Sequence, residues 1–262
     1  MTLYPQADER TPGDAPPHLS LIIPAYNEEA RLEATLKRVC AYLDAQPWAA
    51  EIIIVDDGST DGTRQVGERA FAHHCITEFH HHPRNRGKGY AVRGGMLDAL
   101  GRYRVFYDAD GSTPIEELEK LWPRFEAGAD IVIGSRALAA SDIQVRQAWY
   151  REGMGRVFNA LLRLLRLTPY RDTQCGFKGF TAAAAQAVFP RQHCDGFAFD
   201  AEVLYIAARL GLRIDEVPVR WLNCEHTRLD PVRHSAHMFL EVLRIRLRAW
   251  AGRYRAGQPT AS

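Results

Sequence analysis

The sequence of 262 residues lacks any long hydrophobic run, and no stretch approaches the ~18 consecutive apolar residues that a membrane-spanning helix needs. It also lacks the pattern of a signal peptide, because residues 1–18 are polar and proline-rich and carry no apolar run behind a basic start. We therefore expect a disordered lead over residues 1–18, and a cytoplasmic protein that meets a membrane only at its surface.

Paired cysteines and an excess of one charge are missing as well. The five cysteines are widely spaced and form no C-x-x-C pair, which indicates neither a disulfide framework nor a zinc site and is typical of reduced thiols. Lysine and arginine number 33 against 32 acidic residues, so the net charge of +1 gives no general attraction to nucleic acid. Apolar residues make up 46% of the chain, which is enough for a large core.

Short apolar runs alternate with segments of helical spacing from residue 19 onward. The predicted strands are Leu19 to Pro24, Glu51 to Val55, Cys75 to Phe79, Tyr103 to Tyr107, Asp130 to Gly134 and Ile214 to Val219. Helices are expected between them, including one that begins near Pro114 with Ser112 or Thr113 as its cap, and a last one from about Met238. This alternation predicts an α/β fold, with a mostly parallel sheet covered by helices on both faces.

Polar clusters follow the first four predicted strands at the point where each strand ends. They are Ala25 to Glu28, Asp56 to Ser59, Asn85 to Gly89, and Asp108 to Asp110. Because ligands of open α/β sheets bind beyond the carboxyl ends of the strands, we expect these clusters to converge on one binding site.

Asp108 and Asp110 are the most unusual of these residues, because alternate strand residues point to the same side and their carboxylates then repel each other. A divalent metal such as Mg²⁺, which needs few protein ligands beside substrate phosphates, would neutralise the pair. The alternative is a solvated acidic turn in which Asp110 caps a helix. A phosphatase of the haloacid dehalogenase type fits poorly, since Ser112 stands where Thr or Val is expected, and the spacing around Lys88 matches neither a dinucleotide fingerprint nor a P-loop.

Five motifs in order resemble those of the family 2 inverting glycosyltransferases, over about residues 19 to 230. They are Ile22 to Glu29, Ile54 to Thr63, Asn85 to Gly89, Asp108 to Asp110, and Gly134 to Arg136. Arg171 to Lys178, Phe199 to Glu202 and Val217 to Trp221 narrow the resemblance to the branch that contains dolichyl-phosphate β-glucosyltransferase and, less closely, dolichyl-phosphate mannose synthase. The resemblance implies a GT-A fold with a Rossmann-like sheet, Mg²⁺ or Mn²⁺ as cofactor, and a nucleotide-sugar donor.

The resemblance also implies roles for individual residues. The positions that hold the nucleoside are Pro24, Tyr26, Glu28, Val55 and Asp57. Asp108, Ala109 and Asp110 match the motif that binds the metal and the diphosphate, with Ser112 as a third position near the metal. Arg136 matches a residue near the donor sugar and phosphates, and Arg228 stands in a diluted form of the family's Ser-Lys-Leu, where Arg keeps the charge but changes its geometry.

The reaction implied is transfer of a hexose, most simply glucose from UDP-glucose, to a polyprenyl phosphate with inversion. Two alternatives stay open: a transferase that uses GDP-mannose or another nucleotide sugar with a soluble acceptor, and a binding protein without turnover. An anionic lipid phosphate needs no general base, whereas an alcohol acceptor does, and Asp172 or Asp200 would then supply it or would serve only as a turn or cap residue. The implied division is a nucleotide-sugar half over residues 19–125 and an acceptor half over 126–230.

Two segments of the second half have an apolar face and an arginine-bearing face: residues 158–167 and 239–250, the latter within a basic amphipathic helix and tail over 231–262. Such helices either lie on anionic membranes or pack on their own domain. The neighbouring histidines His80, His81 and His82 suggest a solvated loop in preference to a metal site, since consecutive strand residues cannot all face one ion.

Overall fold

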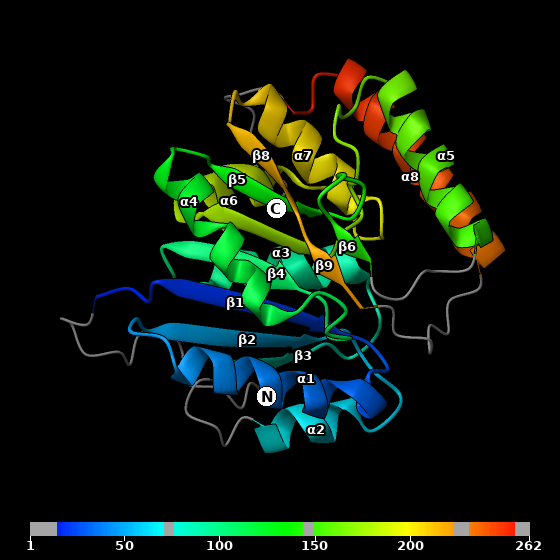
Figure 1. The fold of residues 1–262 in the computed structure, drawn as a ribbon. Helices are drawn as coiled ribbons and strands as arrows, with labels where there is room; N and C mark the ends of the chain where they lie inside the picture. Colours follow the sequence, from blue (N-terminus) through cyan, green and yellow to red (C-terminus); the bar gives the residue numbers. More distant parts are fainter. Residues whose placement is uncertain (1–14, 71–75, 144–148, 223–230, 255–262) are drawn as a thin grey trace.

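A seven-stranded sheet forms the centre of the computed structural model, which describes residues 15–70, 76–143, 149–222 and 231–254 (Figure 1). The strand order is β3-β2-β1-β4-β7-β5-β8. The strands are β1 (Leu19–Ala25), β2 (Ala50–Asp56), β3 (Ile76–His81), β4 (Tyr103–Tyr107), β5 (Ile131–Ser135), β7 (Phe177–Thr181) and β8 (Ile214–Pro218). A separate parallel pair joins β6 (Asp142–Ile143) to β9 (Arg220–Trp221).

The first four strands are parallel, as predicted, and β5 is parallel to β8. Strand β7 runs antiparallel between β4 and β5 and was not predicted as a strand. It follows the Asp172 to Gly176 segment directly, so the chain re-enters the sheet from the edge at which the parallel strands end. That reversal carries residues of the second half into the edge where the first-half motifs gather.

The strands are apolar on both sides because both faces of the sheet are covered. In β2, Ile52 and Ile54 belong to one core cluster, whereas Ile53 and Val55 belong to the other. Helix α1 (Glu29–Asp44) packs on the first face with α2 (Thr63–Ala70), the 3₁₀ turn η1 (Ile115–Lys120) and α4 (Trp122–Glu126). The second face is covered by α3 (Lys88–Asp98), α6 (Ala182–Val188), the short turn η2 (Phe189–Arg191) and α7 (Phe199–Arg209).

Helices α5 (Trp149–Leu164) and α8 (Pro231–Trp250) lie side by side beyond α7 (Figure 1). Helix α8 reaches the second core cluster through Val242 and Ile245. It begins at Pro231, seven residues before the predicted start at Met238. Apolar residues remain exposed on both helices, so the pair covers the domain and still leaves an apolar outer surface.

Two further predictions differ from the structure. The helix predicted from Pro114 is instead the 3₁₀ turn η1 followed by the short α4, and neither Ser112 nor Thr113 caps it, because Pro114 holds the cap position with no side-chain hydrogen bond. Of the lead predicted to be disordered over residues 1–18, residues 1–14 lie outside the described residues, and the last two residues are hydrogen-bonded: the Pro17 carbonyl accepts from the Arg102 N–H, and the His18 N–H donates to the Ala49 carbonyl. The His18 ring packs against both Trp48 and Trp122.

Candidate active site

The carboxyl ends of β1, β2, β3 and β4 meet at one edge of the sheet, as the motif positions predict. The loops there are tied to one another by hydrogen bonds. The Asn27 N–H donates to the Ser59 hydroxyl at 2.9 Å, and the Glu28 N–H donates to the Thr63 hydroxyl at 2.7 Å. Asn27 has a positive φ of 56°, which suits the tight turn after β1. The loops after β1 and β2 therefore form one unit.

Asp108 and Asp110 follow β4 in a turn that several contacts hold in place. The Gly111 N–H donates to the Asp108 carbonyl at 3.1 Å, and the Ser112 N–H donates to Asp110 Oδ1 at 2.9 Å. The Asp108 N–H donates to the carbonyl of Gly176, and a Cβ at Gly176 would lie 1.8 Å from Asp108 Oδ2. A side chain at position 176 would therefore displace this carboxylate from its observed place.

The electrostatics of this turn favour an additional cation. Burial, and after it the charge of Asp108, raises the pKa of the Asp110 carboxyl group. Burial also raises the pKa of Glu28, against the charge of Arg31 and with a contribution from Asp110. The Lys88 ammonium lies 2.6 Å from Asp108 Oδ1. Burial disfavours its charge, but Asp108 and Asp200 outweigh burial and raise the pKa of Lys88.

These residues fit a divalent metal of the kind the sequence implies. Two carboxylates that disfavour each other's charge, with the Ser112 hydroxyl nearby, are oxygen ligands of the type that Mg²⁺ or Mn²⁺ prefers. In the described part of the chain, no group of three or more His, Cys, Asp or Glu side chains is gathered to hold an ion. A metal bound by two carboxylates and the oxygens of a diphosphate does not need such a group.

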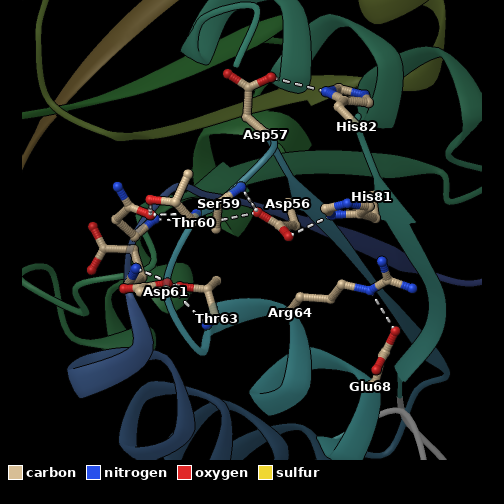
Figure 2. Close-up of polar contacts among 12 residues, drawn as sticks. Asp56, Asp57, Ser59, Thr60, Asp61, Thr63, Arg64, Glu68, His81 and His82 are labelled. Atoms are coloured by element: carbon tan, nitrogen blue, oxygen red, sulfur yellow. Dashed lines mark hydrogen bonds and ion pairs between the residues drawn. The ribbon is translucent and has the colours of Figure 1, made fainter. Parts of the chain in front are cut away.

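Asp56 and Asp57, at the end of β2, are buried and bind the neighbouring strand and loops (Figure 2). Asp56 pairs with His81 Nδ1 at 2.8 Å and accepts from the Ser59 hydroxyl. Asp57 pairs with His82 Nδ1 at 2.9 Å and accepts from the N–H groups of Arg86 and Gly87. Asp57 thereby holds the loop that leads into Lys88. Its predicted place among the nucleoside-binding residues stays a prediction, and its observed contacts position this loop.

The solvated loop predicted for the histidines is wrong for His80 and His81, which lie in β3 and are partly buried. Each has a carboxylate partner, since His80 Nε2 lies 2.8 Å from Glu78. The hydrogen bond to Glu78 raises the pKa of His80 in spite of burial.

The other predicted nucleoside-binding residues line the same edge. Pro24 and Val55 are buried at the ends of paired strands, and Tyr26 is 44% exposed beside them. The Glu28 carboxylate accepts from Arg31 Nε and Nη2, both at 2.7 Å. An exposed aromatic ring beside buried backbone is a surface on which a base can stack.

Arg136, just after β5, forms a bidentate pair with Asp172. Nε donates to Oδ2 at 2.7 Å and Nη2 donates to Oδ1 at 2.9 Å, while the backbone N–H groups of Arg136 and Gln174 donate to the same carboxylate. Burial opposes the charge of Asp172, but Arg136 outweighs burial and lowers the pKa of Asp172 to about 2. A carboxylate so weakly basic and so fully engaged is a poor general base, and it fixes the position of Arg136.

Asp200 and Lys178 form a second pair, at 2.5 Å, with exposures of only 2% and 0%. Lys178 Nζ also donates to the Cys175 carbonyl at 2.6 Å. Burial raises the pKa of Asp200, although Lys178 and Lys88 both oppose this shift. Because Asp200 lies within the field of Lys88, the buried pair is electrostatically connected to Asp108.

The structure thus brings Asp108, Ala109, Asp110 and Ser112 together with Lys88. Asp172 and Asp200 are each paired with a cationic side chain, Arg136 and Lys178 respectively. Arg228 lies outside the described residues. The sequence places Lys88 only within a polar cluster and assigns no role to Lys178. The sequence does not reveal the roles of these two lysines, because no sequence spacing connects a lysine in a glycine-rich loop or in an apolar strand with the distant carboxylate that it contacts.

Comparisons with known proteins agree with this geometry. The model of glycosyl transferase family 2 matches residues 20–189. Dolichyl-phosphate beta-glucosyltransferase of Drosophila melanogaster is 37% identical over 250 residues, covering 90% of this chain and 77% of the relative. The enzyme of the same name from Homo sapiens is 35% identical over 260 residues, covering 92% and 78%.

Among solved structures, glucosyl-3-phosphoglycerate synthase of Mycobacterium tuberculosis, in complex with Mn²⁺, UDP and glucosyl-3-phosphoglycerate, superposes with a TM-score of 0.65. It is 21% identical, and the match covers 90% of this chain and 80% of that one. The same synthase with Mn²⁺ and UDP-glucose gives a TM-score of 0.65 at 20% identity, covering 88% and 79%. These likenesses show the fold, and they confirm the predicted GT-A architecture.

Proposed function

This chain belongs to glycosyl transferase family 2, and we propose that it transfers glucose from UDP-glucose, with inversion, to a polyprenyl phosphate such as dolichyl phosphate. The observation that carries the proposal is the acidic pair after β4, Asp108 and Asp110, set beside Lys88. A nucleoside diphosphate leaves as a polyanion, so such a site stabilises the charge that develops on it. The names of the relatives support both the glucosyl group and the lipid acceptor.

Asp108 and Asp110, with Ser112, would hold Mg²⁺ or Mn²⁺. When bound, the metal supplies Lewis-acid neutralisation of the leaving diphosphate. Lys88, and Arg136 with its guanidinium fixed by Asp172, would provide further positive charge around the diphosphate and sugar. Arg228 is proposed for the same role on its motif alone.

We further propose that residues 19–125 bind the nucleotide sugar and residues 126–230 the acceptor. In the first part, Tyr26 would stack on the base above Pro24 and Val55. Glu28 and Asp57 would complete the nucleoside site, with Asp57 acting mainly through the loop that it holds.

The proposed acceptor removes the need for a general base. A phosphate monoester is already anionic at neutral pH and attacks the anomeric carbon directly, from the side opposite the leaving diphosphate. This agrees with the state of both candidate bases, since Asp172 is paired with Arg136 and Asp200 with Lys178. Their proposed role is to position cations.

The acceptor lipid would be met at a membrane surface. Among the described residues, no helix is both long and apolar enough to cross a bilayer. We propose instead a docking face on α5 and α8, defined by the exposed residues Val157, Leu164, Phe239, Leu240, Leu247 and Trp250. Exposed Arg163 and Arg166 at the end of α5 give this face the charge that anionic lipids attract.

A donor and acceptor panel tests the proposed function. UDP- and GDP-sugars are compared for metal-dependent thermal stabilisation, and the donor that binds is then offered polyprenyl phosphate or a soluble alcohol. We expect stabilisation by UDP-glucose and transfer to the lipid phosphate. Preference for GDP-mannose or for the soluble acceptor would favour the alternative transferase, and binding without turnover would favour a sugar-nucleotide-binding protein.

A further inference from the structure

A cleft of about 520 Å³ opens beside the loop at residues 85–87, which leads into Lys88. Three segments form its walls: the loop at residues 85–87, the loop at residues 193–197 before α7, and the face of α8 from Met238 to Arg248. The first two walls touch closely, because the Tyr90 N–H donates to the Asp195 carbonyl and a Cβ at Gly87 would lie 2.3 Å from that oxygen. The cleft is therefore a built feature of the fold.

Arginines from two walls line this cleft. Among the described residues, the Arg244 guanidinium has no side-chain or carbonyl partner, and it is exposed. Arg86, also exposed, lies over the Tyr90 ring, with Cζ 3.6 Å from the ring centroid, and this contact holds its guanidinium in place. Arg248 lies 3.7 Å from the buried Glu202, so its charge is already paired within the protein.

The two acidic residues of the cleft are engaged with other groups. Asp195 lies 3.6 Å from Arg93 Nη2, and the Glu241 carboxylate accepts from the Ala198 N–H. Among the described residues, neither carboxylate is paired with Arg86 or Arg244, so both guanidinium groups remain available to an anion. An anion with several acceptor oxygens, such as a phosphate monoester, satisfies two guanidinium groups at once.

The cleft also borders an apolar stripe. Leu240 and Leu247 stand four residues before and three residues after Arg244, so all three side chains lie on the same side of α8. The two leucines are 51% and 59% exposed. A phosphate held at Arg244 can therefore carry a hydrocarbon chain that runs over these leucines, whereas a free phosphate gains nothing from them.

We propose that this cleft binds the phosphate of the polyprenyl acceptor, with Arg86 and Arg244 as its ligands and with Leu240 and Leu247 under the lipid chain. The proposal rests on the proposed function and adds the place of the acceptor. The wall at Gly87 adjoins Lys88, whose ammonium contacts Asp108, so the loop that lines the cleft also reaches the proposed diphosphate site.

The test uses the full chain and farnesyl phosphate, a soluble short polyprenyl phosphate. Binding is measured by calorimetry and transfer by steady-state kinetics with UDP-glucose and Mg²⁺, for the wild type and for Arg244→Gln, Arg86→Gln and the double variant Leu240→Ser with Leu247→Ser. The matched control is Arg246→Gln, because Arg246 is on the same helix but lies over Trp250, outside the cleft. Binding of inorganic phosphate and of farnesol is also measured, to separate the contribution of the phosphate group from that of the hydrocarbon chain.

We expect each arginine variant to weaken farnesyl phosphate binding roughly tenfold and to raise its KM similarly, with the KM for UDP-glucose unchanged. The leucine variant should weaken farnesyl phosphate but leave the weak binding of inorganic phosphate unchanged, and Arg246→Gln should match the wild type. Equal binding of farnesyl phosphate by the wild type and both arginine variants overturns the proposal even if transfer proceeds. Binding that depends on the arginines supports the cleft even if glucose transfer is not observed, which separates this proposal from the proposed function.

Discussion

The Lys88 ammonium lies 2.6 Å from the Asp108 carboxylate, whereas Asp110, two residues away, accepts a hydrogen bond from the Ser112 N–H. The two members of the acidic pair therefore have different electrostatic partners. A divalent cation that binds Asp108 competes with Lys88 for the same carboxylate. For Asp110, in contrast, a cation relieves the cost that burial and the Asp108 charge impose.

Because of this difference, we expect two similar substitutions to have different effects on stability. Since the pKa of Asp110 is raised in the folded protein, its ionised form lowers stability at neutral pH, and Asp110→Asn should leave the free energy of unfolding unchanged or higher. Asp108→Asn removes the partner of Lys88 and should lower it by about 1–2 kcal/mol. Urea denaturation at pH 7 measures both.

Both variants should lose at least about 100-fold in transfer rate, because each removes a ligand proposed for the metal and diphosphate. The two variants serve as controls for each other, since we expect activity to fall in both and stability to fall only in Asp108→Asn. Full activity of Asp110→Asn would contradict the metal assignment.

The sequence predicted the parallel part of the sheet and the edge of the site, because those depend on local signals. The predicted strand from Tyr103 to Tyr107 matches β4, and the carboxylates that follow it lie at the strand end. Strand β7 was missed because Lys178 breaks its apolar pattern, and a buried lysine is explained only by its distant partner Asp200. The Arg136–Asp172 pair joins residues 36 positions apart, which no periodicity reveals.

Asp172 predicts a pH dependence of stability. Its pKa is lowered to about 2 in the folded protein, so its contribution is present above the unfolded-state value near 4 and is lost as pH falls toward 2. We expect Asp172→Asn to be less stable than the wild type by roughly 2 kcal/mol at pH 7, with the difference shrinking between pH 4 and pH 2. Denaturation curves at several pH values measure this difference.

Glu126→Gln, at an exposed position at the end of α4, is the control and should show no such trend. A difference between Asp172→Asn and the wild type that stays constant with pH would rule out the paired state of Asp172.

The buried pair of Lys178 and Asp200 predicts strong coupling. Lys178→Met leaves the Asp200 charge without its partner, and Asp200→Leu does the same to Lys178, so each single change should cost about 3–5 kcal/mol of unfolding free energy. The double variant should cost much less than the sum of the two. Lys37→Met, which breaks an exposed pair with Glu33, should change little. Additive effects of the two buried substitutions would show that the pair does not act as a unit.

The proposed docking face predicts a selective loss of membrane binding. Leu164 on α5 is 79% exposed, so Leu164→Ser should reduce cosedimentation with anionic vesicles several-fold while transfer to soluble farnesyl phosphate stays at the wild-type rate. Leu100→Ser is the matched control, at an exposed leucine outside α5 and α8. If both variants bind vesicles as the wild type does, the face proposed on α5 and α8 is incorrect.

The anomeric configuration of the product distinguishes metal-dependent glucosyl transfer with inversion from the alternatives. The wild-type chain is incubated with UDP-glucose, polyprenyl phosphate and Mg²⁺, and the anomeric configuration of the lipid-linked sugar is read by NMR. We expect a β-glucosyl phosphate, inverted relative to the α-linked donor, whose formation EDTA abolishes and excess Mg²⁺ restores. An α-linked product, or transfer that proceeds unchanged in EDTA, would contradict this expectation.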